Sequence, residues 1–205
     1  YYIFDSTTDV AIEAAGAGTD SVLATVTNAT IGSEVEWLVL DTGIGRGTGG
    51  STANTLVGNA VANTLDGGAG ADTLYGGAGN NLYVIDNAGD VIANEIGGMD
   101  SVLSHLENYT LAANIENLAL GTGIVSGTGN ALANTITGNS LGNILDGRAG
   151  IDSLVGGAGN DTYVVDNAGD VVFENAGEGN DLVESSVSHT LSANVERLTL
   201  TGTAV

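Results

Sequence analysis

The 205-residue chain has no cysteine, no proline and no lysine, and its aromatic content is only 4%. Without cysteine, no disulfide can hold the fold together. Positive charge is equally scarce, because three arginines stand against 25 Asp and Glu residues and the formal net charge is −22. Such a chain repels nucleic acid and anionic membrane surfaces, so its natural partner is a cation.

The sequence also lacks a signal peptide and any apolar run long enough to span a membrane. Its first residues, YYIFD, read like the middle of a pattern, so we expect a fragment of a longer protein that carries its targeting information elsewhere. Glycine, by contrast, is abundant at 33 residues, and 42% of the residues are apolar. The apolar content argues for a buried core rather than a disordered acidic chain.

The chain repeats itself with a long period of about 80 residues. The stretch GTGGSTANTLVGNAVANTLDGGAGADTLYGGAGN at 47–80 returns as GTGNALANTITGNSLGNILDGRAGIDSLVGGAGN at 127–160. The first 46 residues are a degenerate copy of the stretch that follows each of these blocks. We therefore predict a partial repeat unit at 1–46, a second at 47–126 and a third at 127–205, joined in one continuous solenoid.

A shorter period of nine residues runs inside each unit, over 49–93 in the second and 129–173 in the third. Position six of every nonapeptide is Asp or Asn. A helix does not fit, because nine residues make two and a half turns and each glycine costs about 1 kcal/mol. A short strand after a glycine turn does fit, with one large apolar side chain per nonapeptide pointing into a narrow core. In the eight nonapeptides of 49–84 and 129–164, these side chains stand at position eight; they are Leu56, Leu65, Leu74, Tyr83, Ile136, Leu145, Leu154 and Tyr163.

One nonapeptide, GGAGADTLY at 67–75, fits the pattern G-G-x-G-x-D-x-U-x, where U is a large apolar residue. Eight nonapeptides in register resemble the hemolysin-type calcium-binding repeats of bacterial RTX (repeats in toxin) proteins, and the resemblance covers linking stretches such as NDTYVVDNAGDVVFENAGEGNDLV. The resemblance implies an all-β, right-handed parallel β-roll or β-solenoid with two nonapeptides per coil. It also implies calcium between stacked glycine-rich turns and export of the unfolded chain by type I secretion.

The residue types favour calcium on their own chemistry. Glycines let turn carbonyl oxygens point toward a common centre, and calcium takes six to eight oxygen ligands at about 2.3–2.6 Å. With eighteen residues per coil, position-six groups on neighbouring rungs lie about 4.8 Å apart, where two carboxylates repel unless a cation lies between them. The metal sites predicted on this basis are Asp72 with Asp90, Asp152 with Asp170, and Asp161 with Asp181.

Further calcium ligands are expected in the turns and in the degenerate copies. Asn81, Asp100, Asp9 and Asp20 stand at positions related to the predicted pairs. The turn carbonyls expected to contribute are those of Gly67, Ala69, Gly76, Ala78, Gly147, Ala149, Gly156 and Ala158.

For several acidic and amide residues, the sequence supports both a role in cation binding and a purely structural role. Asn-only pairs such as Asn63 with Asn81 contribute no charge, so water or a ladder of amide hydrogen bonds is the alternative to a metal. The glutamates that recur every 80 residues are expected on a solvated strand face, with an extra cation site as the alternative. They are Glu36, Glu116 and Glu196. Four further aspartates are either extra calcium ligands or the first residues of Asx turns that cap local N–H groups. They are Asp66, Asp86, Asp146 and Asp166.

The sequence contains no catalytic motif of the serine-hydrolase, zinc-protease or phosphate-binding type, so we do not expect this fragment to be an enzyme. The function predicted is a calcium-binding module that folds on export, as stabiliser or spacer of a larger secreted or surface protein of a bacterium. One alternative is a self-assembling repeat of an extracellular filament, surface layer or adhesin, through end-to-end association. The other is an accessory C-terminal region of a secreted hydrolase or polysaccharide-modifying enzyme.

Overall fold

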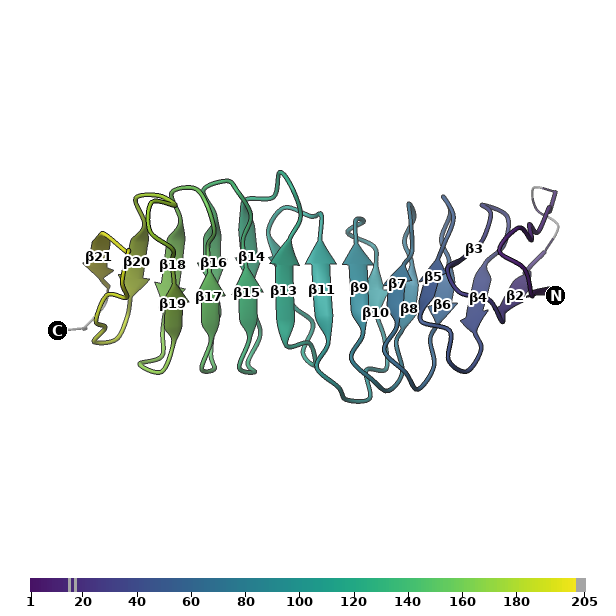
Figure 1. The fold of residues 1–205 in the computed structure, drawn as a ribbon, viewed down its shortest axis with the longest axis horizontal. Coiled ribbons are helices and arrows are strands. Elements are labelled where there is room, and N and C mark those ends of the chain that lie inside the picture. The colour runs from purple at the N-terminus through teal and green to yellow at the C-terminus, as the bar shows by residue number, and fades with distance from the viewer. Residues whose placement is uncertain (15, 17, 202–205) are drawn as a thin grey trace. The chain divides into compact units, whose positions relative to one another are not determined.

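The computed structural model describes residues 1–14, 16 and 18–201, and all regular structure within these ranges is β-strand. The chain forms two compact units, an N-terminal unit of residues 1–101 and a C-terminal unit of residues 102–205. Each unit is a stack of short parallel strands (Figure 1). The predicted all-β parallel solenoid is therefore confirmed, with about 11 turns in all. The division into three repeat units stays a prediction.

The N-terminal unit contains two parallel sheets. Leu38 and Leu40 from the first sheet pack over Gly47 in the second, so the two sheets face each other across the core. The first sheet has the order β1 (Tyr2–Phe4), β2 (Ser21–Ala24), β4 (Trp37–Leu40), β6 (Thr55–Val57), β8 (Thr73–Tyr75) and β10 (Val91–Ile92). The second contains β3 (Ala29–Thr30), β5 (Arg46–Thr48), β7 (Thr64–Asp66) and β9 (Leu82–Ile85); β11 (Ser101–Ser104) begins at the last residue of the unit.

The C-terminal unit repeats this plan, with Leu118 and Leu120 of one sheet packed over Gly127 of the other. One sheet contains β13 (Asn117–Leu120), β15 (Thr135–Thr137), β17 (Ser153–Val155) and β19 (Val171–Phe173). The other has the order β12 (Tyr109–Thr110), β14 (Ser126–Thr128), β16 (Ile144–Asp146), β18 (Thr162–Val165), β20 (Leu182–Ser185) and β21 (Arg197–Leu200).

The strand register confirms that two nonapeptides make one coil. Thr55 pairs with Thr73 in the first sheet of the N-terminal unit, and Ser153 pairs with Val171 in the C-terminal unit, each eighteen residues further along. The linking stretches continue the same sheets with altered spacing, because Ser21 pairs with Trp37 and Leu182 pairs with Arg197. In each unit, these stretches are therefore further rungs of the stack.

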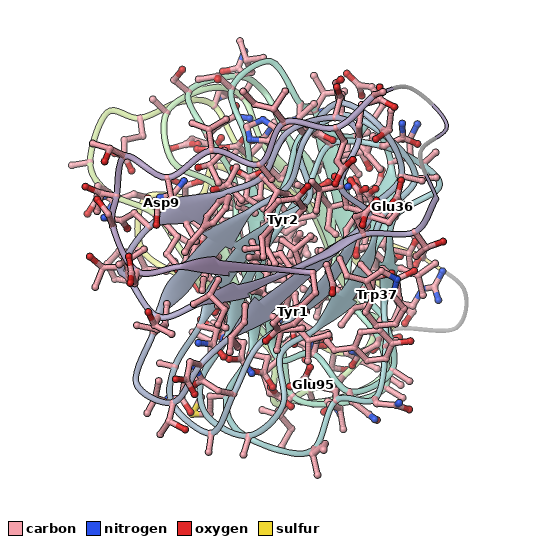
Figure 2. All side chains as sticks on the ribbon, turned by 90° about the vertical axis from the view of Figure 1, so that its right-hand side faces the viewer. Tyr1, Tyr2, Asp9, Glu36, Trp37 and Glu95 are labelled. Carbon is pink, nitrogen blue, oxygen red and sulfur yellow. The ribbon has the colours of Figure 1, made fainter. Side chains whose placement is uncertain are left out.

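The core is a column of the position-eight side chains. Each is about 0% exposed, whereas the residues before and after it in the strand are half-buried or exposed. Burying such a side chain contributes about 1.5–3 kcal/mol, so one per nonapeptide is enough to hold a narrow coil. The turns lie at two opposite edges of each coil, as Asp9 and Glu36 do in the first rungs (Figure 2).

Candidate metal centre

The position-six side chains form hydrogen-bonded ladders along the turn edges. In the N-terminal unit, Asp72 Oδ1 accepts the backbone N–H of Asn54 at 2.7 Å, and Asp90 Oδ1 accepts that of Asp72 at 3.1 Å. Each side chain thus bonds the position-six backbone of the rung before it, eighteen residues earlier. The turn geometry fixes this contact, because the side chain leaves the last residue of the turn just before the strand begins.

The C-terminal unit has two ladders of this kind. On one edge, Asp152 Oδ1 accepts the N–H of Asn134 at 2.7 Å and Asp170 Oδ1 accepts that of Asp152 at 3.0 Å. On the other edge, Asp161 Oδ1 accepts the N–H of Asn143 at 2.6 Å, and Asp181 Oδ1 accepts the N–H of Asp161 at 2.8 Å. The structure therefore places all three predicted Asp pairs on neighbouring rungs, joined by a hydrogen bond.

In two of the three pairs, the second carboxylate caps its own turn, unlike the first. Asp90 Oδ2 accepts the N–H of Asn87 at 3.0 Å, and Asp170 Oδ2 accepts the N–H of Asn167 at 3.1 Å, so each caps its own turn. Asp9 caps its turn in the same way, by accepting the N–H of Ser6 at 2.9 Å. The Oδ2 atoms of the earlier pair members are buried and have no hydrogen-bond partner; these are Asp72, Asp152 and Asp161.

The unpartnered Oδ2 atoms lie against the first glycine of their own turns. A Cβ atom on Gly67 would lie 2.2 Å from Asp72 Oδ2, and one on Gly147 would lie 2.3 Å from Asp152 Oδ2. Burial, with the charge of the next Asp on the ladder as a further cause, raises the pKa of Asp72 and of Asp152 to about 6. Burial likewise raises the pKa of Asp161.

A buried carboxylate oxygen without a donor destabilises the fold unless a proton or a cation compensates it. Calcium fits these positions, because it is a hard cation that binds carboxylate and carbonyl oxygens. Asp72, Asp152 and Asp161 are therefore the residues best placed to hold it, and the bound ion would supply the positive charge that their Oδ2 atoms lack.

The turn residues predicted as carbonyl ligands divide into two groups. The first-position glycines are buried, and their carbonyl oxygens lie close to the first glycine of the preceding rung. A Cβ atom on Gly49, for example, would lie 2.2 Å from the oxygen of Gly67. The buried group is Gly67, Gly76, Gly147 and Gly156, and the exposed third-position group is Ala69, Ala78, Ala149 and Ala158. Coordination by these carbonyls stays a prediction.

Most of the position-six asparagines satisfy their own polar atoms. Asn63 Oδ1 accepts the N–H of Asn59 at 2.8 Å, while its Nδ2 donates to the carbonyl of Ile44 on the preceding rung at 2.9 Å. This is the amide ladder given above as the alternative to a metal. The same two contacts occur at Asn54, Asn134 and Asn143.

Asn81 is oriented differently and resembles the aspartates. Its Oδ1 accepts the N–H of Asn63 at 3.0 Å, and its Nδ2 donates to the carbonyl oxygens of Gly77 and Gly79 at 3.4 and 3.3 Å and to Glu95 Oε1 at 3.3 Å. An amide donor therefore lies where Asp72, Asp152 and Asp161 have an unpartnered oxygen. Asp100 continues this ladder by accepting the N–H of Asn81 at 2.6 Å.

Comparison with protein families agrees with this geometry. The family model described as the RTX calcium-binding nonapeptide repeat (4 copies) matches residues 48–83, 128–163 and 137–172. The chain contains RTX calcium-binding nonapeptide repeats. Neither the curated proteins nor the solved structures compared with the chain include a significant match. Asp72, Asp152 and Asp161 lie within the matched RTX repeats, which assigns them to calcium-binding nonapeptides.

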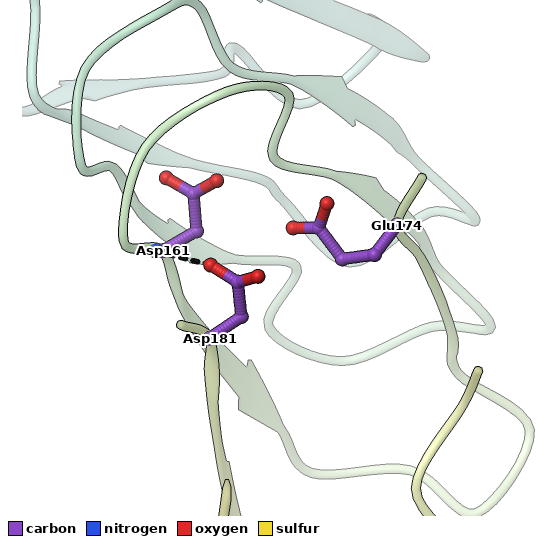
Figure 3. Close-up of side chains that lie close together, drawn as sticks. All are labelled: Asp161, Glu174 and Asp181. Carbon is purple, nitrogen blue, oxygen red and sulfur yellow. Dashed lines mark hydrogen bonds between the residues drawn. The ribbon is translucent and has the colours of Figure 1, made fainter. Parts of the chain in front are cut away.

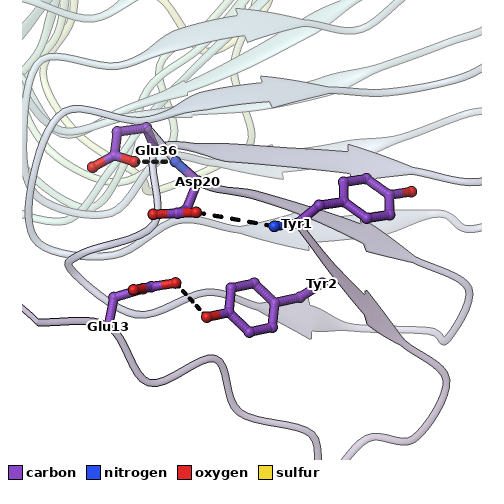
Figure 4. Close-up of polar contacts among 5 residues, drawn as sticks. All are labelled: Tyr1, Tyr2, Glu13, Asp20 and Glu36. Carbon is purple, nitrogen blue, oxygen red and sulfur yellow. Dashed lines mark hydrogen bonds and ion pairs between the residues drawn. The ribbon is translucent and has the colours of Figure 1, made fainter. Parts of the chain in front are cut away.

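Three glutamates outside the matched RTX repeats were missed from the sequence. Glu174 Oε1 accepts the hydroxyl of the buried Tyr163, and the hydroxyls of Tyr83 and Tyr2 donate to Glu95 and Glu13 (Figure 4 shows the last pair). The signal that could have found them is a Glu eleven or twelve residues after each recurring Tyr. Ligand oxygens of Glu174, Asp161 and Asp181 all lie within 4.8 Å of one another (Figure 3).

Two of the recurring glutamates extend the ladders beyond the RTX repeats. Glu36 Oε2 accepts the N–H of Asp20 at 2.8 Å (Figure 4), and Glu196 Oε2 accepts that of Asp181 at 2.9 Å. Glu196 is exposed, as expected for a solvated side chain, whereas Glu36 is half-buried. The strand register brings each glutamate to its aspartate, because the residues that follow them are paired, Ser21 with Trp37 and Leu182 with Arg197.

Proposed function

We propose that this chain is a calcium-binding structural module that folds when it meets extracellular calcium, and that it stabilises or spaces a larger secreted or surface protein of a bacterium. The observation that supports the proposal is the set of buried, unpartnered Oδ2 atoms of Asp72, Asp152 and Asp161. These atoms lie on RTX turns in a chain whose formal net charge is −22.

The physical link is between charge and folding. In the absence of a cation, folding must bring ionised carboxylates out of water and leave part of each without a donor. A cation that binds the folded chain and not the unfolded one adds about 2.7 kcal/mol per site when its concentration is 100 times the Kd. Three such sites together supply about 8 kcal/mol, which is comparable to the free energy of about 5–15 kcal/mol that separates the folded from the unfolded state of a small domain.

Extracellular calcium sites have Kd values of about 10⁻⁴–10⁻³ M, so the same chain stays expanded where calcium is scarce and folds outside the cell. This property suits the unfolded export implied by the RTX resemblance. The described residues include no helix long and apolar enough to cross a membrane. The proposed role needs no catalysis by this chain.

Far-UV circular dichroism of the chain during a calcium titration at neutral pH tests the proposal. We expect a cooperative gain of β-sheet signal as calcium passes about 10⁻³ M. Magnesium at equal ionic strength should produce little change, because it requires near-octahedral geometry and loses its water reluctantly. A full β-sheet spectrum in metal-free buffer at neutral pH, unchanged by calcium, would contradict it.

A further inference from the structure

The C-terminal unit contains a cluster of three buried carboxylates that draws on residues outside the RTX repeats. Asp161 precedes β18, Glu174 follows β19 and Asp181 precedes β20. Their exposed fractions are only 1%, 5% and 1%, and one ligand oxygen of each lies within 4.8 Å of the others (Figure 3). Like charges this close, removed from water, repel strongly unless a positive charge lies among them.

The hydrogen bonds of the cluster leave two buried oxygens without a donor. Asp161 Oδ1 accepts the N–H of Asn143, Asp181 Oδ1 accepts that of Asp161, and Glu174 Oε1 accepts the hydroxyl of Tyr163. Asp161 Oδ2 and Glu174 Oε2 are buried and have no hydrogen-bond partner. Both belong to side chains that are more than nine-tenths buried, so solvent does not compensate them.

No basic side chain compensates the cluster either. Within the described residues, the ion pairs at 4.0 Å or less join Arg46 to Asp66 and the amino group of Tyr1 to Asp20. Neither reaches Asp161, Glu174 or Asp181. The compensating charge has to come from outside the chain.

The equivalent place in the N-terminal unit contains its own donor. Tyr83 and Glu95 stand there as Tyr163 and Glu174 do, but Asn81 takes the place of Asp161. Asn81 Nδ2 donates to two turn carbonyls and to Glu95 Oε1. Because Oδ1 of Asn81 and Oδ1 of Asp161 make the same ladder contact, the atom equivalent to this Nδ2 is Asp161 Oδ2. A donor is therefore replaced by a second negative oxygen, which creates a demand for a cation.

We propose that Asp161, Glu174 and Asp181 form a three-carboxylate cation site, in which Glu174 is a calcium ligand from outside the nonapeptides and Tyr163 is a positioning residue that holds it. The inference rests on the proposed function and deepens it. Three negative charges around one position favour a divalent or trivalent cation with oxygen ligands, and this charge count makes the site tighter than the sites of the nonapeptide pairs.

The calcium-binding isotherm of the full chain, measured by equilibrium dialysis up to saturating calcium, tests the site. Glu174→Gln should keep the number of ions but weaken the tightest site to about the affinity of the nonapeptide pairs, whereas Glu107→Gln, which removes an exposed glutamate of the same unit, should keep the wild-type isotherm. Asn81→Asp should bind one ion more, because it creates the same three-carboxylate arrangement with Glu95 and Asp100. Tyr163→Phe should keep the number of ions but weaken the tightest site several-fold.

The outcomes separate this inference from the proposed function. If the wild type binds no calcium, both fail. If Asp152→Asn loses an ion while Glu174→Gln and Asn81→Asp both bind as the wild type does, calcium binding by the nonapeptides stands and the three-carboxylate site is refuted. Circular dichroism at saturating calcium shows whether Glu174→Gln has folded; if it has not, the extra ion expected in Asn81→Asp decides the question, and its absence overturns the inference.

Discussion

Replacing Asp72, Asp152 and Asp161 together by Asn should remove most of the stabilisation by calcium and should also make the calcium-free chain more stable than the wild type. Asn81 shows why, because an amide in this orientation donates to turn carbonyls instead of leaving a buried oxygen without a donor. Each lost site removes about 2.7 kcal/mol of stabilisation when calcium is at 100 times its Kd.

Urea unfolding of the variant and the wild type in calcium measures the first effect. The β-sheet signal of each chain in metal-free buffer, measured by far-UV circular dichroism, measures the second. The matched control replaces three exposed acidic residues by their amides, namely Asp5, Asp41 and Glu107. The control changes the net charge equally and should keep the calcium response of the wild type. A triple Asn variant that still gains as much from calcium as the wild type would place the binding sites elsewhere.

The pH dependence of stability should have opposite signs in the absence and presence of calcium. Burial raises the pKa of Asp72 and Asp152 to about 6 and that of Glu174 to about 7. A carboxyl group whose pKa is higher in the folded chain than in the unfolded chain stabilises the fold fully below its ordinary pKa, near pH 4. That contribution disappears as the pH rises through 6 to 7. The calcium-free chain should therefore lose stability across this window, by about 1.4 kcal/mol for each unit of pKa shift.

With calcium in excess, the same groups must be ionised to bind, so protons compete with the ion and stability should rise with pH over the same window. The folded fraction in metal-free buffer, measured by far-UV circular dichroism between about pH 4 and about pH 8, and urea midpoints in excess calcium over the same range distinguish the two slopes. The triple Asn variant is the control for the general self-repulsion of the acidic chain, and its calcium-free slope should be shallower. A calcium-free wild type that becomes more stable as the pH rises would be inconsistent with buried carboxylates of raised pKa.

The coil itself could be predicted from the sequence because few physical choices remain once the nonapeptide is recognised. Glycine turns exclude a helix, and one large apolar residue in nine, such as Leu74 or Leu154, has to fill the core. The eighteen-residue register follows, and it brings Asp72 next to Asp90 and Asp152 next to Asp170.

The sequence could not show that the two members of each pair differ. Both are Asp at position six, but Asp90 lies in a turn whose backbone N–H groups reach its second oxygen, whereas no donor reaches that of Asp72. The conformation of each turn decides whether a backbone N–H group reaches the second oxygen, and this conformation cannot be predicted from the residue types alone. Glu174 was missed for another reason, since it lies in a linking stretch where a two-residue insertion breaks the period, and only the folded chain brings it to Asp161 and Asp181.

A crystal structure of the chain grown in calcium tests the central claim most directly. The account predicts calcium ions at about 2.3–2.6 Å from the Oδ2 atoms of Asp72, Asp152 and Asp161. The same fold in abundant calcium, with these three oxygens buried and no cation next to any of them, would contradict it.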